Sequence, residues 1–221
     1  MSDALAHTVP LSIGAAISPI VLMGVLAILG GDRAKPRAIA FTVGFAIMAT
    51  ALLIVGVLVV AALRDRNGGT AESTTLDVVI GVVLIAFGLL MVRPKRKDDE
   101  TKAQEHHRKW IKPDSPLSMF TIFGLVLMLV NVSTIVLLLA VLKEVARSGA
   151  STGDSAVALV IADLFAILPA AGPVVAASIG GAALAGRITQ LGKWTNRNGK
   201  YILCVLFFVF GLQDILKALG H

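Results

Sequence analysis

The chain is short of charged residues and of cysteine, and each shortage excludes a class of protein. Asp, Glu, Lys and Arg make up 15% of the 221 residues, whereas about a quarter of a typical soluble domain is charged. The single cysteine, Cys204, excludes an intrachain disulfide and any Cys-x-x-Cys redox or zinc pair. No Gly-x-x-x-x-Gly-Lys-Ser/Thr motif is present to cradle a nucleotide phosphate, so ATP does not drive the function of this chain alone.

Charged residues are missing from long blocks of the sequence rather than thinned evenly. No charge occurs in Ala38–Leu63, Leu117–Leu142 or Leu164–Gly186. Each block is longer than the roughly 20 mostly apolar residues that cross the hydrocarbon core of a bilayer, so these blocks predict an all-α integral membrane protein. The N-terminus lacks the basic region of a signal peptide, so we expect the first apolar run to be retained as a helix.

The positions of lysine and arginine predict how the helices are oriented. The segments after the first, third and fifth expected spans carry 15 of the 20 basic residues, so the positive-inside rule makes these segments cytoplasmic and puts both termini outside. The net charge of +6 therefore indicates topology rather than a nucleic-acid partner. The six expected transmembrane helices are 8–31, 37–63, 74–92, 117–142, 156–186 and 200–218.

Short similarities recur in the same order in the two halves of the chain. SPIVL at 18–22 in the first span matches STIVL at 133–137 in the fourth. The sequence VVAA occurs in the second and fifth spans, and Phe-Gly-Leu in the third and sixth. Because each half has three spans, the halves would be inverted, as in many secondary transporters. The expected units are a three-helix repeat at 1–92, a charged cytoplasmic loop at 93–116 and a second three-helix repeat at 117–221.

Polar residues lie at the centres of the first and fourth spans. A proline in a helix interior removes a backbone hydrogen bond at a cost of about 3 kcal/mol, so Ser18-Pro19 predicts an interruption in the first helix. Asn131, Ser133 and Thr134 occupy the corresponding part of the fourth span. Binding of substrate at these groups is one interpretation. The alternative is that they only join helices, at about 0.6–2 kcal/mol per hydrogen bond.

The fifth span contains two prolines one turn apart. Pro169 and Pro173, with Gly172 between them, predict a bend or break in this helix. Gly172, Ala176 and Gly180 follow at steps of four residues, which is typical of close helix packing or of a cavity wall.

Asp163 is the one carboxylate clearly inside an expected span. An intramembrane acid indicates a cation site, a proton carrier or a partner for a substrate amine, and the alternative is a water-exposed acid near the outer surface. His106 and His107 are adjacent in a loop and are a weak candidate for a metal site, because further ligands would be needed, so we expect no metal and no cofactor. No catalytic arrangement of side chains is convincing, and we do not expect an enzyme.

The sequence also resembles a known family. AISPIVLMGVLAILGG in the first span, the loop DRAKPRA and the following AFTVGFAIM are similar to the opening of the GAP family, which comprises glycolipid-addressing, Sap-type membrane proteins of actinobacteria in the lysine-exporter (LysE) superfamily. The resemblance continues through the fourth span, FAILPAAGPVVA in the fifth and the terminal Phe-Gly-Leu helix. It implies a six-helix, multi-pass plasma-membrane protein that is associated with export of cell-envelope glycolipids. Ser18-Pro19 matches the first-helix motif, whereas Val132 stands where the superfamily usually has proline after Asn131.

The leading hypothesis is a secondary exporter of a (glyco)lipid or small amphiphile that works by alternating access, with proton coupling through Asp163 as one mechanism. The alternative is an accessory membrane scaffold of a larger lipid-export machine, and an intramembrane enzyme is least favoured. Expected partners are membrane lipids, the lipid substrate, and a second copy of the chain or a large exporter. The candidate substrate-binding residues are Ser18, Pro19, Asn131, Ser133, Thr134, Pro169, Gly172 and Pro173, and the candidate coupling residue is Asp163.

Overall fold

The computed structural model describes most of the chain as helix. Its six bounded helices are α1 (Ser2–Ala15), α2 (Pro19–Leu29), α3 (Ala34–Arg66), α6 (Leu117–Val130), α7 (Val132–Arg147) and α8 (Thr152–Ile179). The expected span at 74–92, nearly all of the loop 93–116 with His106 and His107, and most of 180–221 lie outside the described residues. The described residues are 2–31, 33–66, 115–179, 82, 85, 190, 194, 197, 198, 201, 202, 204, 205, 207–209, 211, 212, 215 and 216.

Two of these helices are long and apolar enough to cross a membrane unaided. They are Ala34–Ala61 within α3 and the whole of α8, each 28 residues. Residues 8–15 of α1 with α2, and α6 with α7, pass the same test as bent pairs, with bends of 42° and 64°. The described residues therefore hold two candidate spans, or four if each bent pair is one span, and the all-helical membrane character is confirmed. The count of six spans, the inverted repeat and the orientation stay predictions.

The first interruption lies at the predicted place. α1 ends at Ala15, Ser18 is extended (φ −120°, ψ 94°), and Pro19 is the first residue of α2. Proline disfavours a helical residue before it and is well tolerated at the first helical position, where the missing N–H would have no intrahelical acceptor. Ser18-Pro19 therefore ends one helix and begins the next.

The predicted interruption of the fifth span is wrong. α8 runs without a break from Thr152 to Ile179, and both Pro169 and Pro173 lie inside it. Tertiary packing explains this continuity, because α8 packs against α1, α2, α3 and α7 and both prolines are buried. Thr42 of α3 also donates a hydrogen bond to the carbonyl oxygen of Ala170 between the two prolines (3.2 Å). Neighbouring helices thus hold the proline-containing segment in one helix.

The close packing expected along Gly172 is found on another face of α8. A methyl group added at Gly172 would meet, among the described residues, only Leu168 of the same helix, at 4.0 Å. The small residues that do pack tightly recur every four residues and are at most 1% exposed: Ala158, Ala162, Ala166 and Ala170. The tightly packed small residues are therefore a different set from the expected stripe. Gly180 of that stripe lies outside the described residues, and the interpretation of the stripe as a cavity wall stays a prediction.

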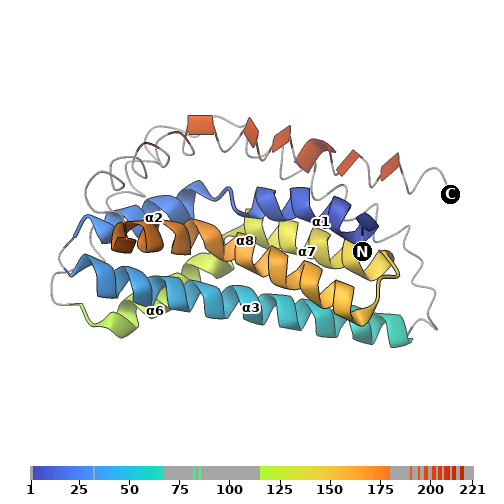
Figure 1. Ribbon diagram of the computed structural model, residues 1–221, viewed down its shortest axis with the longest axis horizontal. Helices are drawn as coiled ribbons and strands as arrows, with labels where there is room; N and C mark the ends of the chain where they lie inside the picture. Colours follow the sequence, from blue (N-terminus) through green and yellow to red (C-terminus); the bar gives the residue numbers. More distant parts are fainter. Residues whose placement is uncertain are drawn as a thin grey trace.

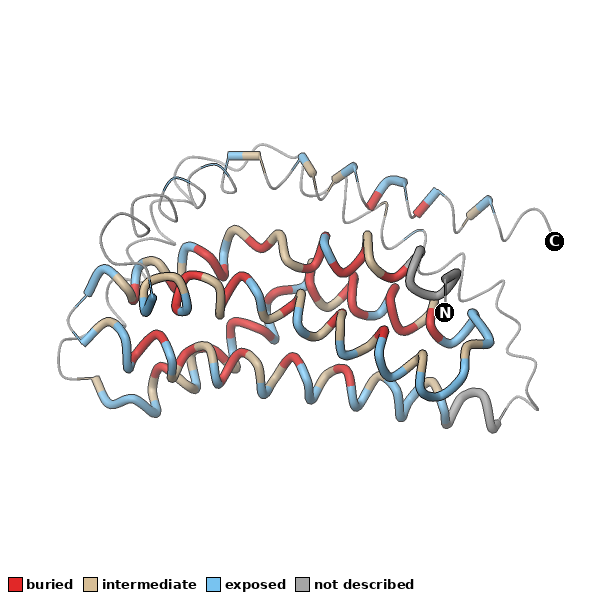
Figure 2. The backbone as a smooth tube through the Cα atoms, in the orientation of Figure 1, coloured by how far each residue is buried: buried red, intermediate tan, exposed pale blue. Residues whose placement is uncertain are grey.

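The helices form an elongated bundle, and α3 and α8 run along its length (Figure 1). α3 packs against α2, α6, α7 and α8, and α1 packs against α7 and α8 (Figure 1). The start of α3, the start of α6 and the end of α2 lie at one end of the bundle (Figure 1). The loop between α7 and α8 lies at the other end. Buried residues face the interior of the bundle and exposed residues face outward (Figure 2).

The crossing of α3 and α6 is the closest in the bundle among the described helices. A methyl group added at Gly44 would collide with the carbonyl oxygen of Thr121, and one added at Gly124 would collide with that of Phe41. The two backbones therefore touch, which only glycine permits at both positions. This crossing fixes the position of α6 on α3.

Candidate polar site where two interrupted helices meet

The two breaks lie at the same depth in the bundle. Ser18 is ten residues after Thr8 and eleven before Leu29, the bounds of its bent span. Asn131 separates α6 from α7, fourteen residues after Leu117 and sixteen before Arg147. At 1.5 Å per residue, each break is about 15–24 Å from either end of its span. If each bent pair is one span, both breaks fall near the middle of a hydrocarbon core about 30 Å thick.

Asn131 joins the two breaks by hydrogen bonds. Its Nδ2 donates to Ser18 Oγ at 3.0 Å and to Thr134 Oγ1 at 2.8 Å. Its Oδ1 accepts a hydrogen bond from Ser133 Oγ at 3.0 Å. We call these four residues the Asn131 cluster. The structure thus brings together side chains from the two halves of the chain that the sequence predicted to belong to one site.

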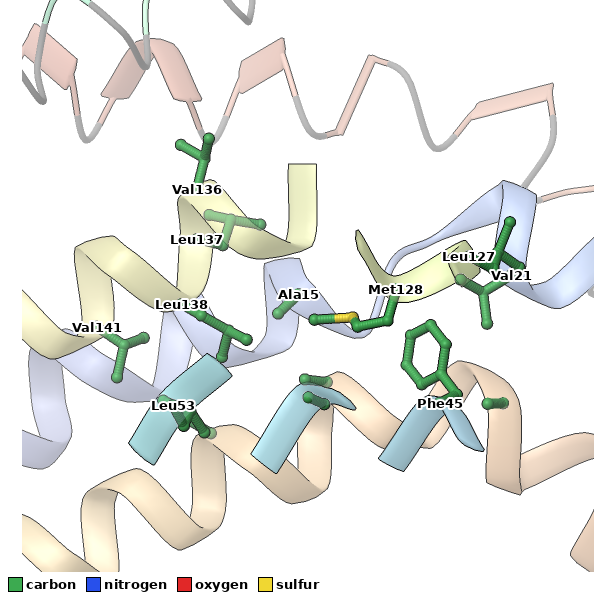
Figure 3. Close-up of a cluster of buried hydrophobic side chains, with 14 of the residues drawn as sticks. Ala15, Val21, Phe45, Leu53, Leu127, Met128, Val136, Leu137, Leu138 and Val141 are labelled. Atoms are coloured by element: carbon green, nitrogen blue, oxygen red, sulfur yellow. The ribbon is translucent and has the colours of Figure 1, made fainter. Parts of the chain in front are cut away.

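The Asn131 cluster is closed off by apolar side chains. Ser18, Asn131 and Thr134 are 1%, 3% and 2% exposed. Figure 3 shows Met128 of α6, three residues before Asn131, between Ala15 of α1 and Phe45 of α3. Because hydrogen bonds are not weakened by water in such surroundings, each polar group here is costly to leave unpaired.

The chemistry of the Asn131 cluster is rich in hydrogen-bond donors. Ser18 Oγ and Thr134 Oγ1 both accept from Asn131, so each hydroxyl keeps its own proton to donate. α2 and α7 both begin at the breaks, and the first N–H groups of a helix have no intrahelical acceptor and carry partial positive charge. Such a site suits a group with several acceptor oxygens.

Asp163 has a partner that the sequence did not indicate. Thr50 Oγ1 of α3 donates to Asp163 Oδ2 at 2.7 Å, while the buried Oδ1 has no hydrogen-bond partner among the described residues. Asp163 is eleven residues from Thr152, the start of α8, about 16 Å along the helix axis. Asp163 is partly exposed and its partner Thr50 is exposed, so the interpretation as a water-exposed acid near the outer surface stays open beside the intramembrane one.

Of the other candidate residues, Pro19 directly follows Ser18 of the Asn131 cluster and is the first residue of α2. Pro169, Gly172 and Pro173 lie six to ten residues beyond Asp163 on α8. No hydrogen bond between described residues connects them to the cluster, and the described residues contain no group of three metal-ligating side chains.

One further polar residue was missed by the sequence interpretation. Arg37, near the start of α3, is only 3% exposed, and its guanidinium lies 5.1 Å from the centroid of the Phe120 ring on α6. The basic linker had suggested only a signal for topology. Nothing local in the sequence distinguishes this buried arginine from Arg33 or Lys35.

Comparison with known families gives one match. The model of the family described as Sap, sulfolipid-1-addressing protein, matches residues 8–218, which is nearly the whole chain. No curated protein and no solved structure gives a match.

Proposed function

The chain belongs to the Sap family of sulfolipid-1-addressing proteins, and from that premise we propose that it is a secondary transporter that moves a lipid across the plasma membrane. Family membership implies a part in the addressing or export of a membrane lipid, and the transport mechanism is our inference. The observation that carries it is the hydrogen bond between Asn131 and Ser18. Secondary transporters place their substrate sites where discontinuous helices meet near the bilayer midplane.

The packing of the helices supports an inverted repeat. If α1, α2 and α3 correspond to α6, α7 and α8, the contact of α6 with α3 corresponds to that of α1 with α8. The contacts of α2 with α3 and α8 likewise correspond to those of α7 with α8 and α3. Both pairs of broken helices are then equivalent. With the distribution of basic residues, this arrangement favours a six-span protein with both termini outside.

The Asn131 cluster would bind the polar headgroup. A headgroup with acceptor oxygens would take the hydrogen bonds that Asn131 Nδ2 gives to Ser18 and Thr134. Separation of Ser18 from Asn131 would then loosen the contact between the two broken helices, which is what alternating access requires. Asp163, whose buried Oδ1 is unpaired among the described residues, is the candidate for coupling this movement to a proton. The role we propose involves no catalysis.

Reconstitution of the purified chain tests this proposal. A fluorescent sulfolipid is placed in one leaflet of liposomes, and its arrival in the other leaflet is measured by quenching. Asn131→Ala removes the two Nδ2 hydrogen bonds that the headgroup would take, at about 0.6 kcal/mol each, so we expect its rate to fall by roughly eightfold. Ser178→Ala is the matched control, because among the described residues Ser178 Oγ bonds only to Val174 O of its own helix. Wild-type rates in Asn131→Ala and Ser18→Ala would contradict a site at the Asn131 cluster.

A scaffold role in a larger export machine is the second candidate. The burial of Ser18, Asn131 and Thr134 favours it, because buried polar side chains that bond to one another also join helices. The same liposomes separate the two candidates. A scaffold gives no flux with the wild-type chain alone, whereas a transporter needs no partner.

A further inference from the structure

The two ends of the bundle are packed differently, although the inverted repeat would make them equivalent. α1 packs against α7 along its length. The equivalent pair is α2 and α6, and these two helices are packed much less closely against each other than α1 and α7 are. They approach at Gly24, where an added methyl group would lie 3.5 Å from Leu127 Cδ2. Figure 1 shows α2 and α6 separating toward the end of the bundle where α3 begins.

Side chains at the end of the bundle where α1 packs against α7 are buried. Leu11 and Ala15 of α1 are each 1% exposed, and Leu138 and Leu142 of α7 are 3% and 5% exposed. Within each pair the residues are four apart, so they lie on one face of their helix. Figure 3 places Ala15 and Leu138 in the same apolar cluster.

The equivalent side chains at the other end are exposed. The offset of 115 between SPIVL and STIVL relates Leu11 and Ala15 to Val126 and Val130, which are 48% and 59% exposed. It relates Leu138 and Leu142 to Met23, which is 39% exposed, and to Ala27, which is also exposed. Residues that are buried in α1 and α7 therefore have equivalents that are exposed in α6 and α2.

We propose that Met23 and Ala27 of α2, with Val126 and Val130 of α6, form a cytoplasmic gate, and that the structure has this gate open and the outer gate of α1 and α7 closed. The proposal rests on the proposed transport function and on the orientation that the basic residues indicate. With this gate open, lipid from the inner leaflet could approach the Asn131 cluster, whose Ser18, Asn131 and Thr134 are still covered by apolar side chains in this structure. An exporter must take its substrate from that side.

The bends of the two broken helices indicate how the gate closes. The first helix bends by 42° at Ser18 and the fourth by 64° at Asn131. In an inverted repeat, the opposite state arises when the halves exchange conformations. The outward-open state should therefore have the larger bend at Ser18 and the smaller bend at Asn131, with α2 and α6 in contact. Because the contacts at Gly44 and Gly124 hold α6 against α3, α3 and α6 should move as one unit when the gate closes.

Cysteine labelling tests the gate without requiring transport. Cys204→Ser gives a cysteine-free chain, into which Ala27→Cys or Ala15→Cys is introduced as a matched pair. A membrane-impermeant maleimide is added to one side of oriented proteoliposomes. We expect Ala27→Cys to be labelled from the cytoplasmic side at least tenfold faster than Ala15→Cys is labelled from either side. Val126→Cys should behave as Ala27→Cys does.

Two results would overturn the gate. Reaction of Ala27→Cys and Val126→Cys with a lipid-soluble maleimide only would mean that these residues face hydrocarbon. Labelling of Ala15→Cys from the outside would mean that the outer gate is open. Labelling as expected without lipid flux would retain the gate and refute transport. Lipid flux without labelling of Ala27→Cys and Val126→Cys would retain transport and overturn the gate.

A cross-link tests whether the gate must move. In the same background, Ala27→Cys with Val126→Cys should form a disulfide under oxidant more readily when lipid substrate is present, and the disulfide should stop transport until a reductant is added. Rapid cross-linking independent of substrate, with unchanged transport, would refute a moving gate. Ala27→Cys alone is the control for damage by the oxidant.

Discussion

Substitution of Gly124 by alanine tests the closest contact in the bundle. The added methyl group would collide with the carbonyl oxygen of Phe41 and lie 2.8 Å from the backbone nitrogen of Phe45. Both are backbone atoms, which cannot rotate away as the end of a side chain can. α6 and α3 would have to separate over the whole crossing, which includes the reciprocal contact of Gly44 with Thr121.

The expected cost follows from overpacking. Extra methyl groups in a packed interior cost about 1–3 kcal/mol, and loss of dispersion contacts along the separated helices adds to this. Replacement of glycine by alanine in a helix returns about 0.5–1 kcal/mol. We expect a net loss of about 1–2 kcal/mol, which lowers the Tm of a chain of this size by about 2–8 °C.

Thermal unfolding in detergent micelles measures this shift. Gly172→Ala is the matched control, because its methyl group would meet only Leu168 of the same helix, at 4.0 Å, among the described residues. That variant should keep the wild-type Tm or exceed it slightly. An unchanged Tm in both Gly124→Ala and Gly44→Ala would show that the α3–α6 crossing is looser than described, and would refute the reasoning.

Three further substitutions test the site and the breaks. Thr50→Val removes the one hydrogen bond to Asp163 found among the described residues, so the rate of transport should fall severalfold. Thr50→Ser keeps a hydroxyl and should restore the rate. Equal rates in Thr50→Val and Thr50→Ser would mean that Thr50 has no part in transport. Asp163→Asn should abolish any dependence of transport on a pH gradient, measured in the same liposomes, and retention of that dependence would exclude coupling through Asp163. Pro19→Ala should impair transport more than Pro173→Ala, because Pro19 lies at a helix break and Pro173 lies inside a continuous helix. A larger loss of transport in Pro173→Ala would argue against a functional break in the first helix.

The sequence predicted the features that depend on local chemistry. The break at Ser18-Pro19 follows from the covalent structure of proline, and the observed φ and ψ of Ser18 are those expected before it. The internal repeat matches Ser18 to Ser133 and so pointed to the polar segment 131–134 as the equivalent part of the fourth span. The structure places a second break there although Val132, not proline, follows.

Features that depend on long-range packing could not be predicted in this way. Pro169 and Pro173 stay helical because both are buried in a helix that packs against four others. Thr50 bonds to a carboxylate on a helix distant in the sequence, and no local pattern marks it among other polar residues of the apolar spans. The burial of Arg37 against Phe120 likewise needs the crossing of two helices.

The unbroken length of α3 has a consequence for the surrounding lipid. Its uncharged stretch from Ala38 to Leu63 extends about 39 Å, whereas the hydrocarbon core of a typical bilayer is about 30 Å thick. α3 has no interruption at which it could fold back. To keep this apolar length out of water, the helix must lean by roughly 40° or stretch the acyl chains around it. The bundle should thus favour thick regions of the envelope, where long-chain lipids gather.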